Sequence, residues 1–171
     1  MKIYIGSDHV GFEFKEKLKN YLESLGMGYK VIDKGAFSYD KDDDYPDFIK
    51  PVAEAVAKDN LEAKLPSMGV VIGGSGQGEA MCANRVKGVR VAVFYGPKES
   101  VLPVDVTGRE SLDTFELIKL ARIHNNANIL SIGLRFTTPD EAKFAIELFL
   151  TTKFSGDERH LRRIKKLETR T

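Results

Sequence analysis

The chain has 171 residues, of which 42% are hydrophobic and 30% charged, a balance typical of one globular domain. Its 26 Lys and Arg residues nearly cancel its 25 Asp and Glu residues, leaving a formal net charge of +1. Such a chain has no long-range positive field to gather nucleic acid or an acidic membrane. Cys82, the single cysteine, has no partner for an internal disulfide, which suits a reducing compartment.

The N-terminal residues do not resemble a secretion signal, because polar Ser7, Asp8 and His9 interrupt the first apolar stretch. The longest apolar runs, such as 91–95, are far shorter than the ~18 residues that a membrane span needs. We therefore expect a cytoplasmic protein with neither a membrane nor a nucleic acid as its partner.

Short apolar runs alternate along the chain with amphipathic segments. The apolar runs predict five strands, at 2–7, 29–35, 68–72, 89–95 and 128–133. Residues repeating every three or four positions predict helices at about 14–25, from 45 onward, and at 79–86, 113–125, 139–151 and 157–169.

The predicted strands are uniformly apolar, which is typical of a parallel sheet covered on both faces. The expected fold is therefore a single α/β domain over 1–171, a three-layer αβα, Rossmann-like open sheet of five parallel strands. The stretch 96–112 has no sustained period and contains Pro97, Pro103 and Gly108. We interpret it as an insertion that forms a lid or an interface arm.

Ligands of open parallel sheets bind beyond the carboxyl ends of the strands, where the strand order reverses. Three polar segments are expected to lie at this edge or to reach it. They are 7–9 after the first strand, 73–78 after the third, and 124–126 after the helix that follows the fourth.

The loop 73–78 reads Gly-Gly-Ser-Gly-Gln-Gly, and so many glycines let the backbone approach a ligand and turn N–H groups toward an anion. The spacing of its glycines fits neither a dinucleotide-binding fingerprint nor a P-loop. The alternative to an anion-binding loop is a glycine-rich turn that allows tight packing. Glu79 follows at a helix start, where the helix dipole alone favours a carboxylate. Beside an anion nest, Glu79 could instead be a base that takes a proton next to a carbonyl.

The remaining polar groups allow two interpretations each. Asp8 is either the N-cap of the first helix or a site residue. His9, His124 and His160 each adjoin a polar residue, which disfavours a buried core position for them. Because no two histidines have i, i+4 spacing, we expect no metal site and assign them to proton handling or phosphate contact.

From Lys153 onward seven basic residues accompany three acidic ones, a local charge of +4. Arg159, Arg163 and Lys166 share one face of the predicted last helix. This face is either a solvated surface whose cations complement the helix C-terminus or a clamp for a phosphate group.

Six segments in chain order resemble type B ribose-5-phosphate isomerase and the related galactose-6-phosphate isomerase subunits. They are 6–11, 44–46, 73–79 with 83–86, 124–128, 133–135 and 159–164. The resemblance implies aldose–ketose isomerisation of a phosphorylated sugar through an enediolate, with no metal or nucleotide cofactor. It also implies a homodimer or a dimer of dimers whose subunits share the active sites.

By position, the resemblance implies that Glu79 moves the proton between C1 and C2 and that His124 assists ring opening. It places Asp8, Tyr45 and Asn125 near the sugar hydroxyls. It implies an enediolate-binding loop of Gly74, Ser75 and Gly78. The implied phosphate and substrate contacts are His9, Arg135, Arg159 and Arg163.

Two features depart from the family pattern. Many members have a cysteine base where this chain has Gly73, whereas Glu79 in the same loop matches another branch, and we expect Cys82 to be a small buried thiol. The segment before His124 is also longer than in typical members. Ribose 5-phosphate is the simplest substrate, and a four- or six-carbon sugar phosphate or a non-catalytic sugar-phosphate-binding module are the alternatives.

Overall fold

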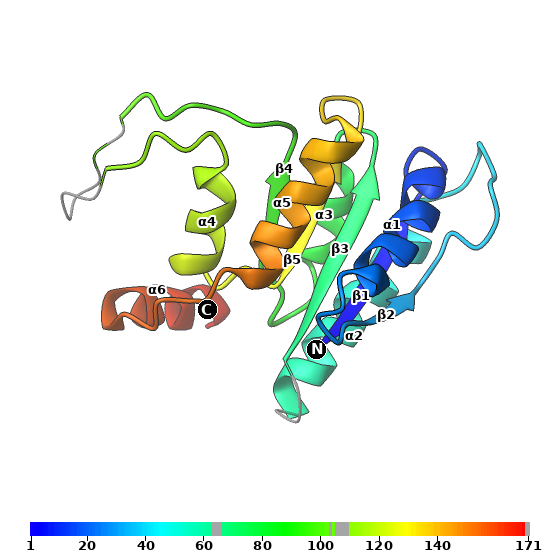
Figure 1. Ribbon diagram of the computed structural model, residues 1–171. Coiled ribbons are helices and arrows are strands. Elements are labelled where there is room, and N and C mark those ends of the chain that lie inside the picture. Colours follow the sequence, from blue (N-terminus) through cyan, green and yellow to red (C-terminus); the bar gives the residue numbers. More distant parts are fainter. Residues whose placement is uncertain (63–65, 103, 105–109, 170–171) are drawn as a thin grey trace.

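The computed structural model describes residues 1–62, 66–102, 104 and 110–169. They form an all-parallel sheet in the order β2-β1-β3-β5-β4, which confirms the predicted α/β class (Figure 1). The strands are β1 (Lys2–Ser7), β2 (Lys30–Asp33), β3 (Ser67–Gly73), β4 (Val91–Phe94) and β5 (Ile129–Gly133). The helices are α1 (Phe12–Ser24), α2 (Pro46–Glu62), α3 (Gln77–Ala83), α4 (Glu116–Ile123), α5 (Pro139–Thr151) and α6 (Glu158–Glu168).

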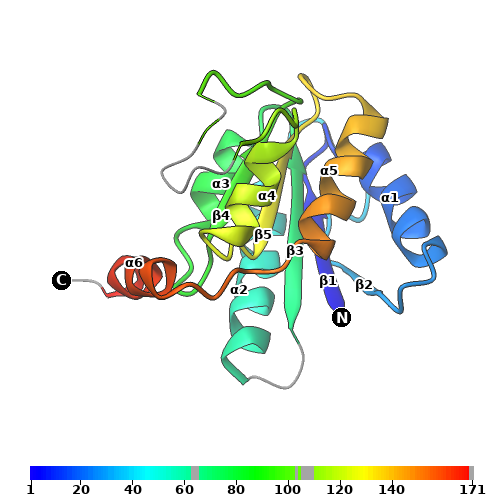
Figure 2. The same ribbon diagram turned by 60° about the vertical axis from the view of Figure 1, so that its left-hand side comes forward.

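The helices cover both faces of the sheet (Figures 1 and 2). One core packs α1, α4 and α5 against one face, and the other packs α2 and α3 against the opposite face. In central β3, Val70 and Ile72 belong to the first core and Val71 to the second. Both sides of β3 are therefore apolar, because successive side chains point to opposite faces and both faces are covered.

Element boundaries follow local chemistry. The predicted helix 139–151 matches α5, where Thr138 and Glu141 form a capping box. The predicted helix 113–125 begins later, at α4, because the Asp113 carboxylate accepts a hydrogen bond from the backbone N–H of Phe115 at 2.8 Å and closes a turn first. No helix among the described residues is long and apolar enough to cross a membrane.

The strand order reverses between β1 and β3. From β1 the chain passes through α1 to β2 on one side, whereas from β3 it passes through α3 to β4 on the other. Such a switch point opens a crevice at the carboxyl ends of the two strands. Asp8 and His9 follow β1 there, and the glycine loop 73–78 follows β3.

Residues 103 and 105–109 of the segment 96–112 lie outside the described residues, and the described residues that follow β4 lead away from the sheet (Figure 1). The two ends of the segment are joined by a hydrogen bond from the N–H of Lys98 to the carbonyl of Thr114 at 2.7 Å. The described Val101 and Leu102 are largely exposed. Its interpretation as a lid or an interface arm stays a prediction.

Candidate active site

Glu79, in the first turn of α3, is buried with only 4% of its surface exposed. Its carboxylate lies against the end of β3: a Cβ atom added to Gly73 would meet Oε1 of Glu79 at 2.0 Å. The carboxylate therefore occupies the space that a side chain at position 73 would fill.

The glycine loop packs tightly on β5. The Ser131 hydroxyl donates a hydrogen bond to the Gly76 carbonyl at 2.7 Å, and a Cβ added to Gly133 would lie 2.6 Å from the carbonyl oxygen of Ser75. Gly76 has a φ of 74°, in the left-handed region that glycine adopts without strain. The glycines of this loop thus allow its backbone to pack tightly against β5.

The carboxyl groups of Glu79 and Asp8 both have raised pKa values at this edge. Burial raises the pKa of Glu79, and the nearby Asp8 adds to the rise while the backbone N–H of Glu79 opposes it. Burial also raises the pKa of Asp8, opposed mainly by the N–H of Gly11. A carboxylate whose pKa is raised toward neutrality is a better proton acceptor than an exposed one.

Asp8 closes the turn between β1 and α1. Its Oδ1 accepts hydrogen bonds from the N–H groups of Val10 at 3.0 Å and Gly11 at 3.2 Å. The N-cap of α1 is Gly11, so the expectation that Asp8 could occupy the N-cap position was wrong. These hydrogen bonds fix the Asp8 carboxylate near Glu79.

Two further predicted residues contact the glycine loop. A Cβ added to Gly78 would lie 2.9 Å from Cζ of Tyr45, and one added to Gly74 would lie 3.1 Å from Nε of Arg135. Both glycines therefore leave room for these larger side chains. Tyr45 and Arg135 lie with Glu79 around one loop.

His9 has a partner that the sequence analysis missed. Its Nδ1 lies 2.7 Å from Oδ1 of Asp43, a residue of the acidic run 40–44. The hydrogen bond to Asp43 is the main cause that raises the pKa of His9, and the positive charge of Arg135 lowers it. The run of acidic residues beside the Tyr45-Pro46 turn was the available signal, but no spacing rule connects it to His9.

The second group of predicted residues lies elsewhere in the chain. His124 and Asn125 follow α4, which runs from the carboxyl end of β4 back toward the amino end of β5, and Arg159 and Arg163 belong to α6 at that same edge (Figures 1 and 2). The expectation that 124–126 lies at one edge with the glycine loop is therefore wrong within a single chain. The predicted site is therefore divided into two groups of residues. The carboxyl-edge group comprises Asp8, His9, Tyr45, Gly74, Ser75, Gly78, Glu79 and Arg135. The amino-edge group comprises His124, Asn125, Arg159 and Arg163.

The turn after α4 is held by the buried Arg122. Its guanidinium donates to the side-chain oxygen of Asn126 at 3.0 Å, to the carbonyl of Thr152 at 3.1 Å and to the carbonyl of Ala127. Asn126 has a φ of 45°, which asparagine tolerates better than most residues. These bonds fix the turn that carries His124 and Asn125.

His124 stacks on His160 of α6, with ring centroids 4.3 Å apart and planes at 16°. His160 is only 6% exposed, so the expectation that none of the histidines is buried was wrong for this one. Its ring is covered through the tertiary contact with α4, which its polar sequence neighbours did not indicate.

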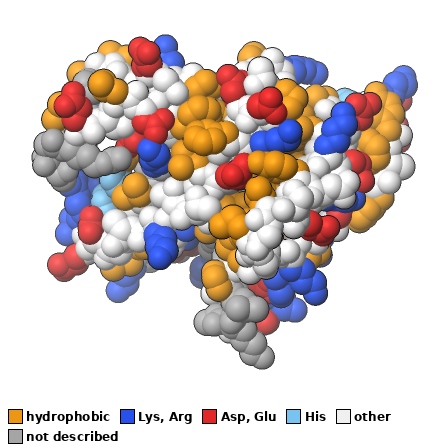
Figure 3. All heavy atoms as spheres, viewed as in Figure 1, with side chains coloured by type: hydrophobic (Ala, Val, Ile, Leu, Met, Phe, Trp, Pro, Cys, Tyr) orange, Lys and Arg blue, Asp and Glu red, His pale blue; other side chains and the backbone are white. Residues whose placement is uncertain are grey.

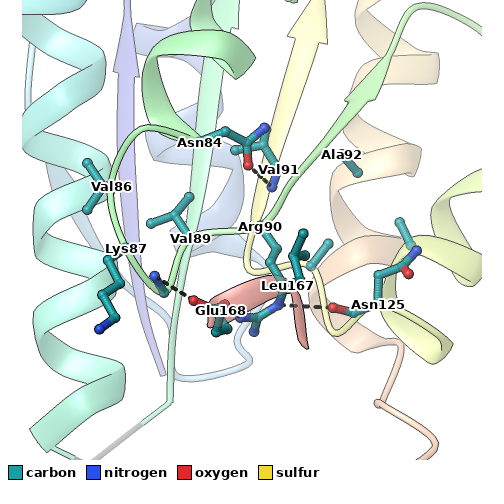
Figure 4. Close-up of a pocket in the computed structure, with 13 residues that line it drawn as sticks. Asn84, Val86, Lys87, Val89, Arg90, Val91, Ala92, Asn125, Leu167 and Glu168 are labelled. Carbon is teal, nitrogen blue, oxygen red and sulfur yellow. Dashed lines mark hydrogen bonds and ion pairs between the residues drawn. The ribbon is translucent and has the colours of Figure 1, made fainter. Parts of the chain in front are cut away.

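A cavity of about 530 Å³ lies beside this turn. Figure 4 shows Arg90 between Glu168 of α6 and Asn125, and its guanidinium is 2.6 Å from Oε1 of Glu168 and 3.0 Å from the carbonyl oxygen of Asn125. Figure 3 shows Lys, Arg and His side chains together over the region of α6. Asn125 of the amino-edge group lines this cavity, whereas Arg159 and Arg163 belong to the neighbouring helix α6.

Most of the chain matches one protein family. A model of the family "Ribose/Galactose Isomerase" matches residues 3–104 and 113–167. The chain belongs to the ribose/galactose isomerase family. The family match omits 105–112, which lies within the insertion predicted at 96–112.

Curated relatives of this chain and solved structures of similar proteins agree with the assignment. Ribose-5-phosphate isomerase B of Mycolicibacterium paratuberculosis is 41% identical over 164 residues, which cover 96% of this chain and 87% of the relative. The structure of ribose-5-phosphate isomerase B from Mycoplasma genitalium with bound ribulose-5-phosphate is 34% identical, with a TM-score of 0.80 over 98% of this chain and 93% of that one. The structure of the Clostridium thermocellum isomerase B is also 34% identical, with a TM-score of 0.78 over 98% and 95% of the two chains.

Proposed function

We propose that this protein interconverts ribose 5-phosphate and ribulose 5-phosphate through an enediolate, with Glu79 as the base. The observation that carries the proposal is the Glu79 carboxylate, buried beside the glycine loop at the switch point of the sheet. The carboxylate takes the proton from C2 of the open aldose and returns it to C1, while a proton moves from O2 to O1. N–H groups of the loop around Gly74, Ser75 and Gly78 stabilise the enediolate oxygen.

The other predicted residues bind the sugar and its phosphate. Asp8 and Tyr45 contact hydroxyls, and His9 and Arg135 beside the glycine loop supply positive charge. The amino-edge group contributes His124 for ring opening, Asn125 for a hydroxyl, and Arg159 and Arg163 for the phosphate. Neither a metal nor a nucleotide takes part in these assignments.

The proposed isomerase acts as a homodimer, or a dimer of dimers, because one chain holds the two groups at opposite edges of its sheet. A two-fold arrangement would bring the amino-edge group of one subunit to the glycine loop of the other. A doubly tagged heterodimer of Glu79→Gln and Arg163→Ala subunits then has one intact site and about half of the wild-type activity per dimer. Activity no higher than that of the better parental homodimer would refute a shared site.

Proton NMR in D2O with ribose 5-phosphate tests the reaction itself. We expect ribulose 5-phosphate to form with deuterium entering at the carbon next to the carbonyl. Glu79→Gln should still bind the substrate but lose turnover by at least the ~10²–10⁴-fold typical of a lost general base. Glu54→Gln, at an exposed position of α2, is the matched control.

Two other results would change the assignment. Deuterium exchange only with four- or six-carbon sugar phosphates would leave the reaction type unchanged but assign a different substrate. The additional residues that the family match omits suggest this alternative. Binding without any exchange would indicate a non-catalytic sugar-phosphate-binding module.

A further inference from the structure

His9 is held by a single buried carboxylate. Its Nδ1 is 2.7 Å from Oδ1 of Asp43, whose side chain is 6% exposed, whereas that of His9 is 30% exposed. The other oxygen, Oδ2 of Asp43, is also buried and has no hydrogen-bond partner among the described residues. The charge of Asp43 is therefore directed to His9 rather than divided among several cations.

This contact decides which ring nitrogen of His9 remains for a ligand. A carboxylate can only accept a hydrogen bond, so Nδ1 carries the proton and Nε2 is the remaining nitrogen. In a neutral ring Nε2 would be an acceptor and would repel a phosphate oxygen. In an imidazolium, Nε2 carries a proton and donates a charge-assisted hydrogen bond to that oxygen.

We propose that Asp43 is a positioning residue that orients the His9 ring and keeps it an Nε2–H donor for the phosphate group of the substrate. This inference rests on the proposed function, because it assigns a purpose to the positive charge beside the glycine loop. Asp43 touches His9 and does not itself contact the substrate.

The charged surroundings of His9 support this role. Asp43 in the loop before α2 is the largest influence that raises the pKa of His9, and Asp8 in the turn before α1 adds to it. Burial and Arg135, which follows β5, act in the opposite direction. Tyr39 adds an edge-to-face ring contact at 6.5 Å. The two carboxylates therefore favour the protonated His9 ring against the smaller opposing effect of Arg135.

The same geometry would also arise if Asp43 only fastened the loop to the turn that carries His9. The loop has its own ties, from the N–H of Asp43 to the carbonyl of Asp40 at 3.2 Å and from the N–H of Asp42 to the Asp40 carboxylate at 3.0 Å. Asp43→Asn preserves the shape and the hydrogen-bond acceptor while removing the charge, and so separates the two roles.

Asp43→Asn should lower the pKa of His9, measured by NMR titration of its ring, because the main stabilising carboxylate is lost. Below both pKa values the variant and the wild type should have the same KM for ribose 5-phosphate. Above the lowered pKa the KM of the variant should rise about tenfold, the low end for a charge-assisted contact, with kcat nearly unchanged. Exposed Asp42→Asn, one residue away, is the matched control and should behave as the wild type.

An unchanged pKa of His9, or a KM that rises equally at every pH, would overturn the proposal. A double variant with His9→Gln is a second check, since Asp43→Asn should cost nothing more once His9 is absent. If the wild type does not isomerise ribose 5-phosphate, the proposed function fails separately. The His9 titration, repeated with and without inorganic phosphate, then still tests Asp43, because phosphate should raise the pKa of His9 in the wild type more than in the variant.

Discussion

Gly73→Ala should impair Glu79 without unfolding the protein. The added Cβ would meet Oε1 of Glu79 at 2.0 Å, and real Cβ atoms essentially never approach other atoms closer than 3.0 Å. The carboxylate must therefore retreat by about 1 Å, and a misplacement of about 1 Å costs roughly 10²-fold in rate. The moved atom is the end of a flexible side chain and Gly73 does not have a left-handed φ, so stability should change by no more than about 1 kcal/mol.

A double-mutant cycle shows whether Gly73→Ala acts through Glu79. Steady-state kinetics with ribose 5-phosphate would compare the wild type, Gly73→Ala, Glu79→Gln and the double variant, with thermal unfolding of each. We expect the roughly 10²-fold loss in kcat to disappear in the Glu79→Gln background, where no base remains to be displaced. Wild-type kcat in Gly73→Ala, or the same loss in both backgrounds, would refute the reasoning.

Three other outcomes follow from the structure. Arg163→Ala should weaken binding of a phosphorylated ligand by about 10–100-fold in calorimetry, with little effect on its unphosphorylated analogue. Lys165→Ala, on the opposite side of α6, should leave the affinity for both ligands unchanged. Burial raises the pKa of Glu79 in the folded state above the ordinary value of 4.5, so the free energy of unfolding falls as the pH rises above that value and the buried carboxyl ionises. The melting temperature of Glu79→Gln should therefore be higher than that of the wild type near pH 7. The two melting temperatures should converge near pH 4. Shortening 96–112 should change the kcat/KM ratio between five-carbon and other sugar phosphates more than the melting temperature, and a large drop in melting temperature would instead mean that the segment is packed structure.

The sheet could be predicted because its three central strands, β1, β3 and β5, are buried on both faces. β3 is the clearest case, since all of its residues are buried and its apolar run leads directly into the glycine loop. α5 was equally accessible, because Thr138, Pro139 and Glu141 mark its start by local chemistry alone. The helix start depends on interactions between residues close together in the sequence. The strand depends on burial, which appears directly in the sequence as a run of apolar residues.

The parts that sequence reasoning missed depend on contacts between distant segments. Asp43 lies 34 positions from His9, and an acidic loop has no periodicity to show which carboxylate turns inward. His160 has polar neighbours in sequence, yet the stack with His124 buries its ring. The edge at which His124 lies follows from the direction of α4, which carries the chain from the carboxyl end of β4 to the amino end of β5, whereas its polar residue types alone do not show this.

Gly73 and the Glu79 carboxylate share one small volume at the end of β3. The end of β3 and the first turn of α3 converge so closely that the Oε1 atom of Glu79 lies within 2.0 Å of where a Cβ at residue 73 would be. A short side chain from the strand and a longer one from the helix therefore compete for the same volume. With the Glu79 carboxylate in its present position, the strand residue has no room for a side chain, and Gly73 leaves that space free. A cysteine at position 73 would overlap the Glu79 carboxylate unless that side chain moved.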